Sequence, residues 1–184
     1  MTRMRVNCDG RSRARGFTLL EILVVVVIIG ILVTFATLSI GNRALDDRLE
    51  VESVRLEQTL RLAAEEAETK GVQLGFRYTA EGYGFYATGK DGTWAPYASA
   101  GPLRMRELVA PIYLDLQVEG RKVKPALNPQ DSKEAKIEPQ VLLLSSGEVT
   151  ASTFDLRAEG FGPYYRVDVT ALGKITRARH EEGS

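Results

Sequence analysis

The histidine, cysteine and acidic side chains are the first candidates for chemistry in this chain. His180 is the only histidine, so a Ser-His-Asp triad and a cluster of histidine metal ligands are both excluded. Cys8 is the only cysteine and lies in the basic N-terminal stretch, so the rest of the chain can form no disulfide and no cysteine metal site. Asp115, Asp155 and Asp168 fall on separate predicted strands, which leaves an acid–base or metal-binding pair open but favours solvated faces. We therefore expect no catalytic site, no metal and no cofactor.

One carboxylate stands beside an apolar segment. Glu21 precedes the uncharged run Ile22 to Ile40, whose 19 residues would span about 28 Å as a helix, close to one hydrocarbon core. The run is longer than the apolar region of a secretory signal peptide, and it is too long for an ordinary buried helix. We expect a membrane-spanning helix. Glu21 then either lies at the headgroup level, where the helix dipole favours an acid, or has a function that offsets its cost in the bilayer.

The distribution of charge predicts an orientation for this helix. The first 16 residues hold five arginines and one aspartate, whereas the charges that follow the apolar run nearly cancel. Excess arginine keeps the N-terminus in the cytoplasm and places the remainder in the periplasm of a Gram-negative cell. The whole chain has 24 basic and 24 acidic residues, so the part after the first 16 carries a net charge of −4. That balance argues against non-specific binding of nucleic acid.

The stretch RGFTLLEILVVVVIIGIL resembles the class III signal of type IV pilins and type II secretion pseudopilins. In that signal a basic leader ends in glycine and is followed by Phe-Thr-Leu, a hydrophobic residue, Glu and a long apolar helix. The resemblance implies that prepilin peptidase cleaves between Gly16 and Phe17 and that the new amino group of Phe17 is methylated. It also implies an assembly role for Glu21, which would meet the terminal amine of a neighbouring subunit. Residues 1–16 would be a removed leader, and residues 17–41 a transmembrane and filament-core helix.

The remainder, residues 42–184, is predicted to be a periplasmic α+β domain. Leucines and alanines recur every three, four or seven residues from Leu45 to Ala67, so the helix is expected to run from about residue 17 to 70 and to pack its second half on a sheet. The period then changes to two, and the predicted strands are VQLGFRYT, GFYAT, residues 112–118, the buried QVLLL, and segments around Phe154, Tyr165 and KITRA. Residues 119–139, rich in proline and charge, predict a functional or mobile surface loop.

Two stretches of the globular part resemble the H-type minor pseudopilins, the GspH/FimT-like family. They are TWAPY at residues 93–97 and QVLLLSSGEVTASTFDLR at residues 140–157. The resemblance implies a pilin-like α+β fold and a minor pseudopilin of the type II secretion system, which assembles into the periplasmic pseudopilus near its tip. The implied partners are other major and minor pseudopilins, prepilin peptidase and the inner membrane, with no nucleic acid and no small-molecule substrate.

Two other functions stay open at this point. A minor type IV pilin that binds DNA during uptake would need a basic patch, and its candidates are Lys174, Arg177, Arg179 and His180, although two glutamates follow at once. A membrane-tethered periplasmic enzyme would need a catalytic constellation, which the sequence lacks. The pattern G-x-G-x-x-A at residues 82–87 lies in a predicted hairpin with no helix after it, so it does not indicate a dinucleotide site.

Overall fold

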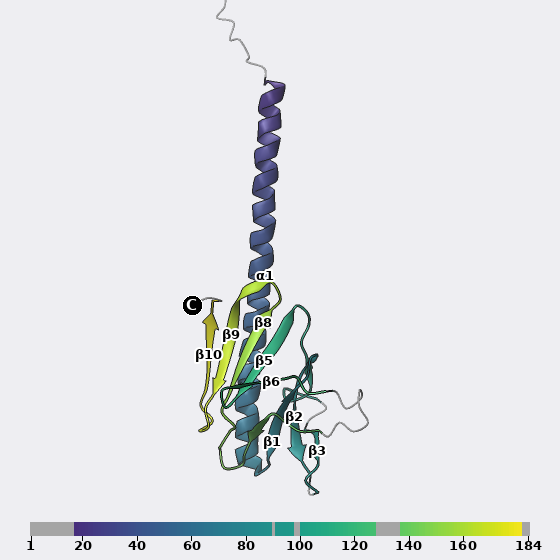
Figure 1. Ribbon diagram of the computed structural model, residues 1–184, viewed down its shortest axis with the longest axis vertical. Helices are drawn as coiled ribbons and strands as arrows, with labels where there is room; N and C mark the ends of the chain where they lie inside the picture. The colour runs from purple at the N-terminus through teal and green to yellow at the C-terminus, as the bar shows by residue number, and fades with distance from the viewer. Residues whose placement is uncertain (1–16, 90, 98–99, 128–136, 182–184) are drawn as a thin grey trace, which may run out of the picture. The chain divides into compact units, whose positions relative to one another are not determined.

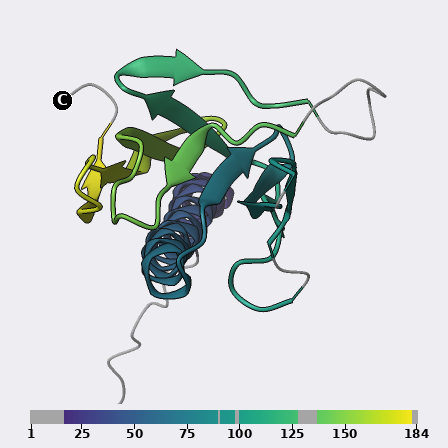
Figure 2. The same cartoon turned by 90° about the horizontal axis from the view of Figure 1, so that it is seen from below.

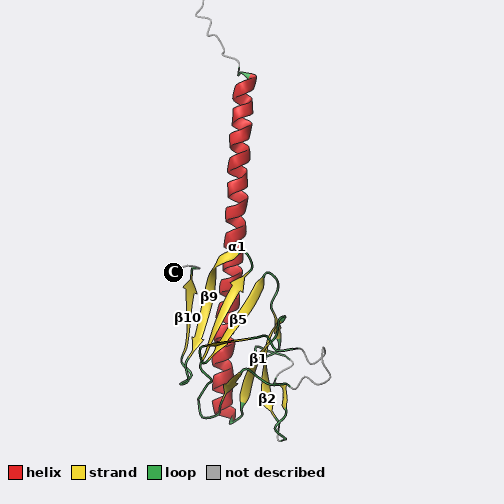
Figure 3. Ribbon diagram, in the orientation of Figure 1, coloured by secondary structure: helices red, strands yellow, loops and turns green. Residues whose placement is uncertain are grey.

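The computed structural model describes residues 17–89, 91–97, 100–127 and 137–181, and within the helix it does not describe the side chains of residues 35–42. The expected leader, residues 1–16, lies outside the described residues. The chain divides into two compact units, Met1–Gly41 and Asn42–Ser184. Figure 3 shows one helix followed by strands, and the described residues contain no second helix. The α+β prediction is therefore confirmed.

The helix α1 spans Leu19–Lys70, close to the predicted bounds. It begins at Leu19 because the Thr18 side chain accepts a hydrogen bond from the first turn, as described below. It ends because Gly71 adopts a positive φ of 63°, which glycine tolerates best. The amide of Val72 then donates to the carbonyl of Ala67 at 3.1 Å, the six-to-one bond of a Schellman motif.

The first sheet is antiparallel and has the strand order β3-β2-β1-β7, with β4 also paired to β2. Its strands are β1 Leu74–Tyr78, β2 Gly82–Thr88, β3 Trp94–Pro96, β4 Arg106–Glu107 and β7 Val141–Leu143. The predicted hairpin is confirmed as β1–β2. Gly82 belongs to this hairpin for a steric reason, because a Cβ there would lie 1.9 Å from the carbonyl oxygen of Arg106. The buried strand predicted at QVLLL forms as β7, in which Leu142 is half-buried between two buried neighbours.

The second sheet is also antiparallel, in the order β10-β9-β8-β5-β6. Its strands are β5 Ile112–Val118, β6 Arg121–Val123, β8 Ser152–Ala158, β9 Phe161–Val169 and β10 Ile175–His180. The prediction of a surface loop over residues 119–139 is wrong for its first part, because β6 pairs with β5 there. The Tyr78 hydroxyl also donates to the carbonyl of Val123 at 2.6 Å. Residues 128–136 of that segment lie outside the described residues.

The core of the second unit lies between the second half of α1 and the two sheets. Viewed along the helix, the strands lie over one side of this half of α1 (Figure 2). That side carries the buried residues Leu49, Leu56, Leu60, Ala63 and Ala67. The two sheets meet where the Phe76 and Phe154 rings contact edge to face, with centroids 5.1 Å apart. The helical spacing read from the sequence thus matches the buried positions in this half of α1, beside which the strands lie in Figure 1.

Candidate functional site

The start of α1 holds Phe17 and Glu21, two of the three residues predicted to act in processing and assembly. The Glu21 amide donates to Thr18 Oγ1 at 3.2 Å, so Thr18 is the N-cap and Glu21 is the third helical residue. This is the T-x-x-E pattern of a capping box, a signal that the sequence itself contains. The Glu21 side chain bonds no other described residue, and its place in the first turn complements the helix dipole. Gly16 lies outside the described residues.

The first half of α1 is apolar on every side. From Leu19 to Val33 each large apolar side chain leaves between 43% and 86% of its surface exposed. A helix that is apolar all round, with no polar stripe, needs surroundings other than water. No helix within the described part of the chain is both long and apolar enough to cross a membrane.

The C-terminal basic residues are divided between the two faces of β10. Arg177 and Arg179 point to α1, where Arg177 Nε lies 3.4 Å from Glu57 Oε2 and an Arg179 nitrogen lies 3.2 Å from Asp46 Oδ2. The His180 ring instead stacks on Tyr164, with centroids 5.3 Å apart. The two arginines therefore fasten β10 to the helix. They do not combine with His180 into one exposed basic surface.

Not all of the aspartates Asp115, Asp155 and Asp168 lie on a solvated face. Asp155 is 4% exposed, and its two carboxylate oxygens accept hydrogen bonds from Arg166 at 2.7 and 2.9 Å. Asp155 raises the pKa of Arg166, chiefly through these bonds. Its cross-strand neighbour Asp115 lies 3.0 Å from Lys122 Nζ, and Asp168 accepts a hydrogen bond from Thr153. The expectation of a solvated face is wrong for Asp155, because a cation across the strand pair compensates its burial. Among the described residues, no cluster of three or more metal-binding side chains forms.

The TWAPY motif ends in a contact with the last turns of the helix. Lys70 Nζ lies 2.8 Å from Glu66 Oε2 and 2.9 Å from Tyr97 Oη, and the Tyr97 hydroxyl also donates to Glu66. The hydrogen bonds from Lys70 and Tyr97 lower the pKa of Glu66. Tyr97 thus holds the segment after β3 on α1, a role that the motif itself did not indicate.

Comparison with known proteins identifies relatives over most of the chain. The family model for the prokaryotic N-terminal methylation motif matches residues 11–37. The type II secretion system protein H of Pseudomonas aeruginosa is 32% identical over 152 residues, which cover 82% of this chain and 86% of the relative. The protein of the same name from Aeromonas hydrophila is 29% identical over 178 residues, 94% of this chain and 97% of the relative.

Solved structures show the same fold. The crystal structure of the minor pseudopilin EpsH from the type II secretion system of Vibrio cholerae aligns with a TM-score of 0.60 at 23% identity. The alignment covers 72% of this chain and 96% of that structure. A second EpsH structure gives a TM-score of 0.58 at 22% identity. At these identities the likeness establishes a shared arrangement of helix and sheets.

Proposed function

Because the chain belongs to the type II secretion system protein H family, we propose that it is a minor pseudopilin that assembles near the tip of the periplasmic pseudopilus. There it supports the export of folded proteins across the outer membrane, and it works by assembly, not catalysis. Residues 17–41, which include the helical residues 35–41 whose side chains the structure does not describe, form a membrane span and later the filament core, with the N-terminus cytoplasmic. Residues 42–184 form the periplasmic domain, and its partners are the other major and minor pseudopilins.

One observation carries this proposal beyond the family: the exposed apolar surface of α1 from Leu19 to Val33. Keeping such surface away from water is favourable by about 25 cal/mol per Å². In the membrane, lipid covers these apolar side chains. In a filament, the helices of neighbouring subunits cover them. The same surface therefore serves both states, and the periplasmic domain is carried along when the subunit moves from one to the other.

Glu21 acts at the step where lipid is exchanged for neighbouring helices. A carboxylate near the end of a membrane helix is costly unless a cation compensates it. In the filament that cation is the N-terminal amine of Phe17 in an adjacent subunit. Phe17 is 74% exposed and lies one turn before Glu21, which is also exposed, so both residues are accessible to a neighbouring subunit. Assembly is then favoured over the isolated subunit by the pairing.

Processing at Gly16 tests the proposal directly. Mass spectrometry of the protein extracted from membranes should give a chain that starts at methylated Phe17. Gly16→Leu should leave the uncut precursor, because the side chain obstructs the backbone where the peptidase acts. Gly10→Leu places the same side chain elsewhere in the leader and should be processed normally. An intact leader in the unaltered protein would refute this part of the proposal.

Secretion tests the assignment to the pseudopilus. Deleting the gene should leave the exported proteins in the periplasm, and supplying the gene again should return them to the culture medium. Normal secretion in the deletion strain, together with loss of DNA uptake, would instead identify a pilin of the DNA-uptake type. The ion pairs of Arg177 and Arg179 with α1 weigh against that alternative, since they remove the charges that DNA would need.

A further inference from the structure

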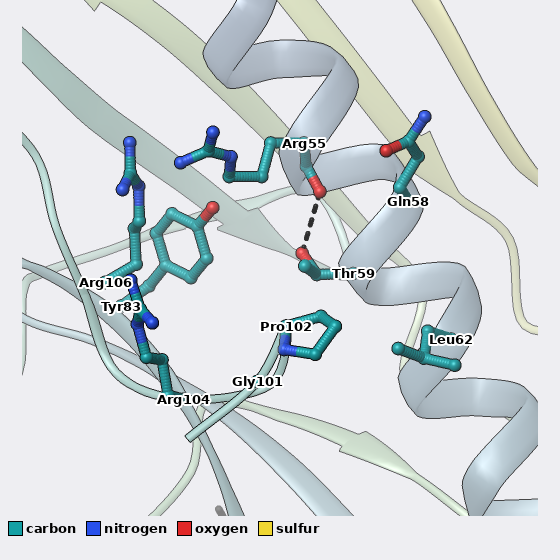
Figure 4. Close-up of a pocket in the computed structure, with 9 residues that line it drawn as sticks. All are labelled: Arg55, Gln58, Thr59, Leu62, Tyr83, Gly101, Pro102, Arg104 and Arg106. Carbon is teal, nitrogen blue, oxygen red and sulfur yellow. Dashed lines mark hydrogen bonds between the residues drawn. The ribbon is translucent and has the colours of Figure 1, made fainter. Parts of the chain in front are cut away.

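A pocket of about 450 Å³ opens on the second unit between α1 and the strands β2 and β4. Figure 4 shows Arg55 and Thr59 reaching it from the helix, Tyr83 from β2, and Arg104 and Arg106 from the opposite wall. None of these residues belongs to the N-terminal segment or to the C-terminal basic cluster. The pocket is therefore separate from the features that account for processing and filament-core packing.

The charges around this pocket do not balance. Among the described residues, Glu52 is the one carboxylate that contacts its arginines. Arg106 holds both oxygens of Glu52, with Nε 3.2 Å from Oε2 and a terminal nitrogen on Oε1. Arg55 approaches the same carboxylate only at 3.9 Å, and Arg104 forms no ion pair with any described residue. Arg104 is thus left without an ion pair among the described residues, and Arg55 keeps only the long contact with Glu52, so both guanidinium groups can pair with an incoming anion.

A buried hydroxyl beneath the arginines points to the same conclusion. Tyr83 is 2% exposed, and its hydroxyl lies beside the Thr59 side chain without a hydrogen bond of good geometry in the described part of the chain. The nearby Thr59 hydroxyl donates instead to the carbonyls of Arg55 and Leu56, at 3.0 and 3.1 Å. Burial, with a further contribution from Glu52, raises the pKa of Tyr83 to about 12, so the hydroxyl keeps its proton at neutral pH. Figure 4 shows Arg55 extending toward this hydroxyl.

The surroundings indicate what kind of molecule carries the anion. A neighbouring hollow shares Arg106 with the pocket, and its lining combines the apolar Val51, Val109 and Ile112 with charged residues of α1. Val51, Val109 and Met105 expose 56%, 64% and 50% of their surface. Protein interfaces are enriched in arginine and methionine and bury such apolar side chains, whereas nucleic acid prefers a broadly basic surface that this acidic domain lacks. The occupant that fits is an acidic side chain on a protein.

We propose that this arginine pocket binds a carboxylate side chain of another pseudopilin, while Val51, Met105 and Val109 pack against the apolar residues beside that carboxylate. Arg55 and Arg104 supply paired N–H donors to the two oxygens, a geometry that suits a carboxylate. The Tyr83 hydroxyl lies beneath Arg55, and when Arg55 turns outward to meet the ligand this hydroxyl can donate to the same group. This inference rests on the proposed function, which supplies the class of partner.

The test uses the processed full-length chain in detergent and, one at a time, the other pseudopilins encoded with it. The dissociation constant is measured for the unaltered chain and for Arg55→Glu/Arg104→Glu. Losing two charge-assisted contacts should weaken binding of one pseudopilin by about tenfold or more. Arg121→Glu reverses an exposed charge on β6, in the other sheet, and should leave binding unchanged. Arg104→Gln should give a smaller loss, and it covers the case in which the double variant unfolds.

A second set of measurements identifies the source of the carboxylate. Acid-to-lysine substitutions in the pseudopilin that binds should restore its affinity for Arg55→Glu/Arg104→Glu. Inorganic phosphate, duplex DNA and phosphatidylglycerol vesicles should not compete with the pseudopilin. Competition by any of these, or dependence on Arg104 only in self-association of this chain, would overturn the proposal. So would unchanged binding of every pseudopilin by both Arg104 variants.

Failure of the pocket proposal can be distinguished from failure of the proposed function. If the chain restores secretion but its Arg104 variants bind all pseudopilins normally, the pocket proposal fails and the function stands. If the chain is neither processed nor needed for secretion, the function fails whatever the pocket binds.

Discussion

The two halves of α1 belong to one continuous helix but differ in how far their apolar side chains are exposed. In the first half, Val25 and Val26 on adjacent faces expose 43% and 61% of their surface, and their large apolar neighbours behave alike. In the second half, Leu49 and Leu56 are fully buried, while the charged residues between them mostly face solvent. The first half lacks any polar face, and the second half has a single apolar stripe.

The difference shows how the sequence of a helix specifies its environment. A stripe repeated every three, four or seven residues can be covered by one surface, and the two sheets of the second unit provide it. An apolar surface on all sides can only be covered by a continuous apolar medium or by several other helices. The second half therefore stabilises the fold of this chain. The first half is expected to determine whether the chain lies in lipid or packs against other helices.

Leu56 should show the largest effect on folding. Leu56→Ala removes a side chain with no exposed surface and leaves a cavity, so the free energy of unfolding should fall by about 2–5 kcal/mol. Val26→Ala, the matched change in the first half, should leave it unaltered. Urea denaturation of the full chain in detergent, followed by fluorescence of Trp94, the only tryptophan, measures the second unit alone. Equal losses in the two variants would abolish the distinction between the halves.

Glu52 and Glu21, one in each half of α1, should give the next largest difference in the free energy of unfolding. Glu52→Gln weakens the pair with the partly buried Arg106 and should lower the free energy of unfolding by about 1–2 kcal/mol. Glu21→Gln has no such partner and should leave unfolding unchanged while preventing incorporation into pseudopili. Unfolding in urea and the amount of subunit in sheared filaments are the two measurements. Normal incorporation of Glu21→Gln would remove the assembly role of Glu21.

Tyr97 tests how firmly the end of the second half is held. Tyr97→Phe removes the hydroxyl bonded to Glu66 and Lys70 and should cost about 0.5–1.5 kcal/mol. Because the folded pKa of Glu66 is lowered from 4.5, its contribution is fully present above pH 4.5 and is lost as the pH falls through the lowered value. The stability difference between the two proteins should therefore shrink below pH 4.5. A constant difference at all pH values would show that Glu66 is not the relevant partner.

The smallest effect is expected when the two arginines of β10 are removed and DNA binding is measured. The full chain should not retard duplex DNA at about 150 mM salt, since Arg177 and Arg179 are already paired with α1. Arg177→Ala/Arg179→Ala should leave that result unchanged and lower the free energy of unfolding only slightly, as expected for two partly exposed ion pairs. Tight DNA binding that disappeared in the double variant would show that these arginines serve a ligand and not the helix.

Local patterns predicted most of the fold because they depend on neighbours in the sequence. The helix from Leu19 to Lys70 follows from apolar spacing and the glycine at its end, and the β1–β2 hairpin follows from alternation around a turn. The segment 119–139 was misjudged because its strand β6 is only three residues long and has no apolar alternation. Its pairing depends on the neighbouring β5, which composition cannot show.

The contacts between residues distant in the sequence could not be read in the same way. Asp155 looked like a solvated acid, and only the pairing of β8 with β9 places Arg166 across from it. The arginine pocket likewise unites Arg55 on the helix with Arg104, near the start of β4, and no motif connects the two. The terminal arginines resembled a basic patch until the fold placed Asp46 and Glu57 beside them.

The sequence by itself determined the helix, the period of the strands and the order of elements, because helical and strand periodicity are properties of consecutive residues. It also determined the expectation of processing at Gly16, through a motif contained in one short stretch. Only the tertiary structure decided which charges compensate one another and which stay free, because packing α1 against two sheets brings together residues far apart in the chain. Free and compensated charges decide where a partner can bind, so the pocket at Arg55 and Arg104 became visible only in the fold.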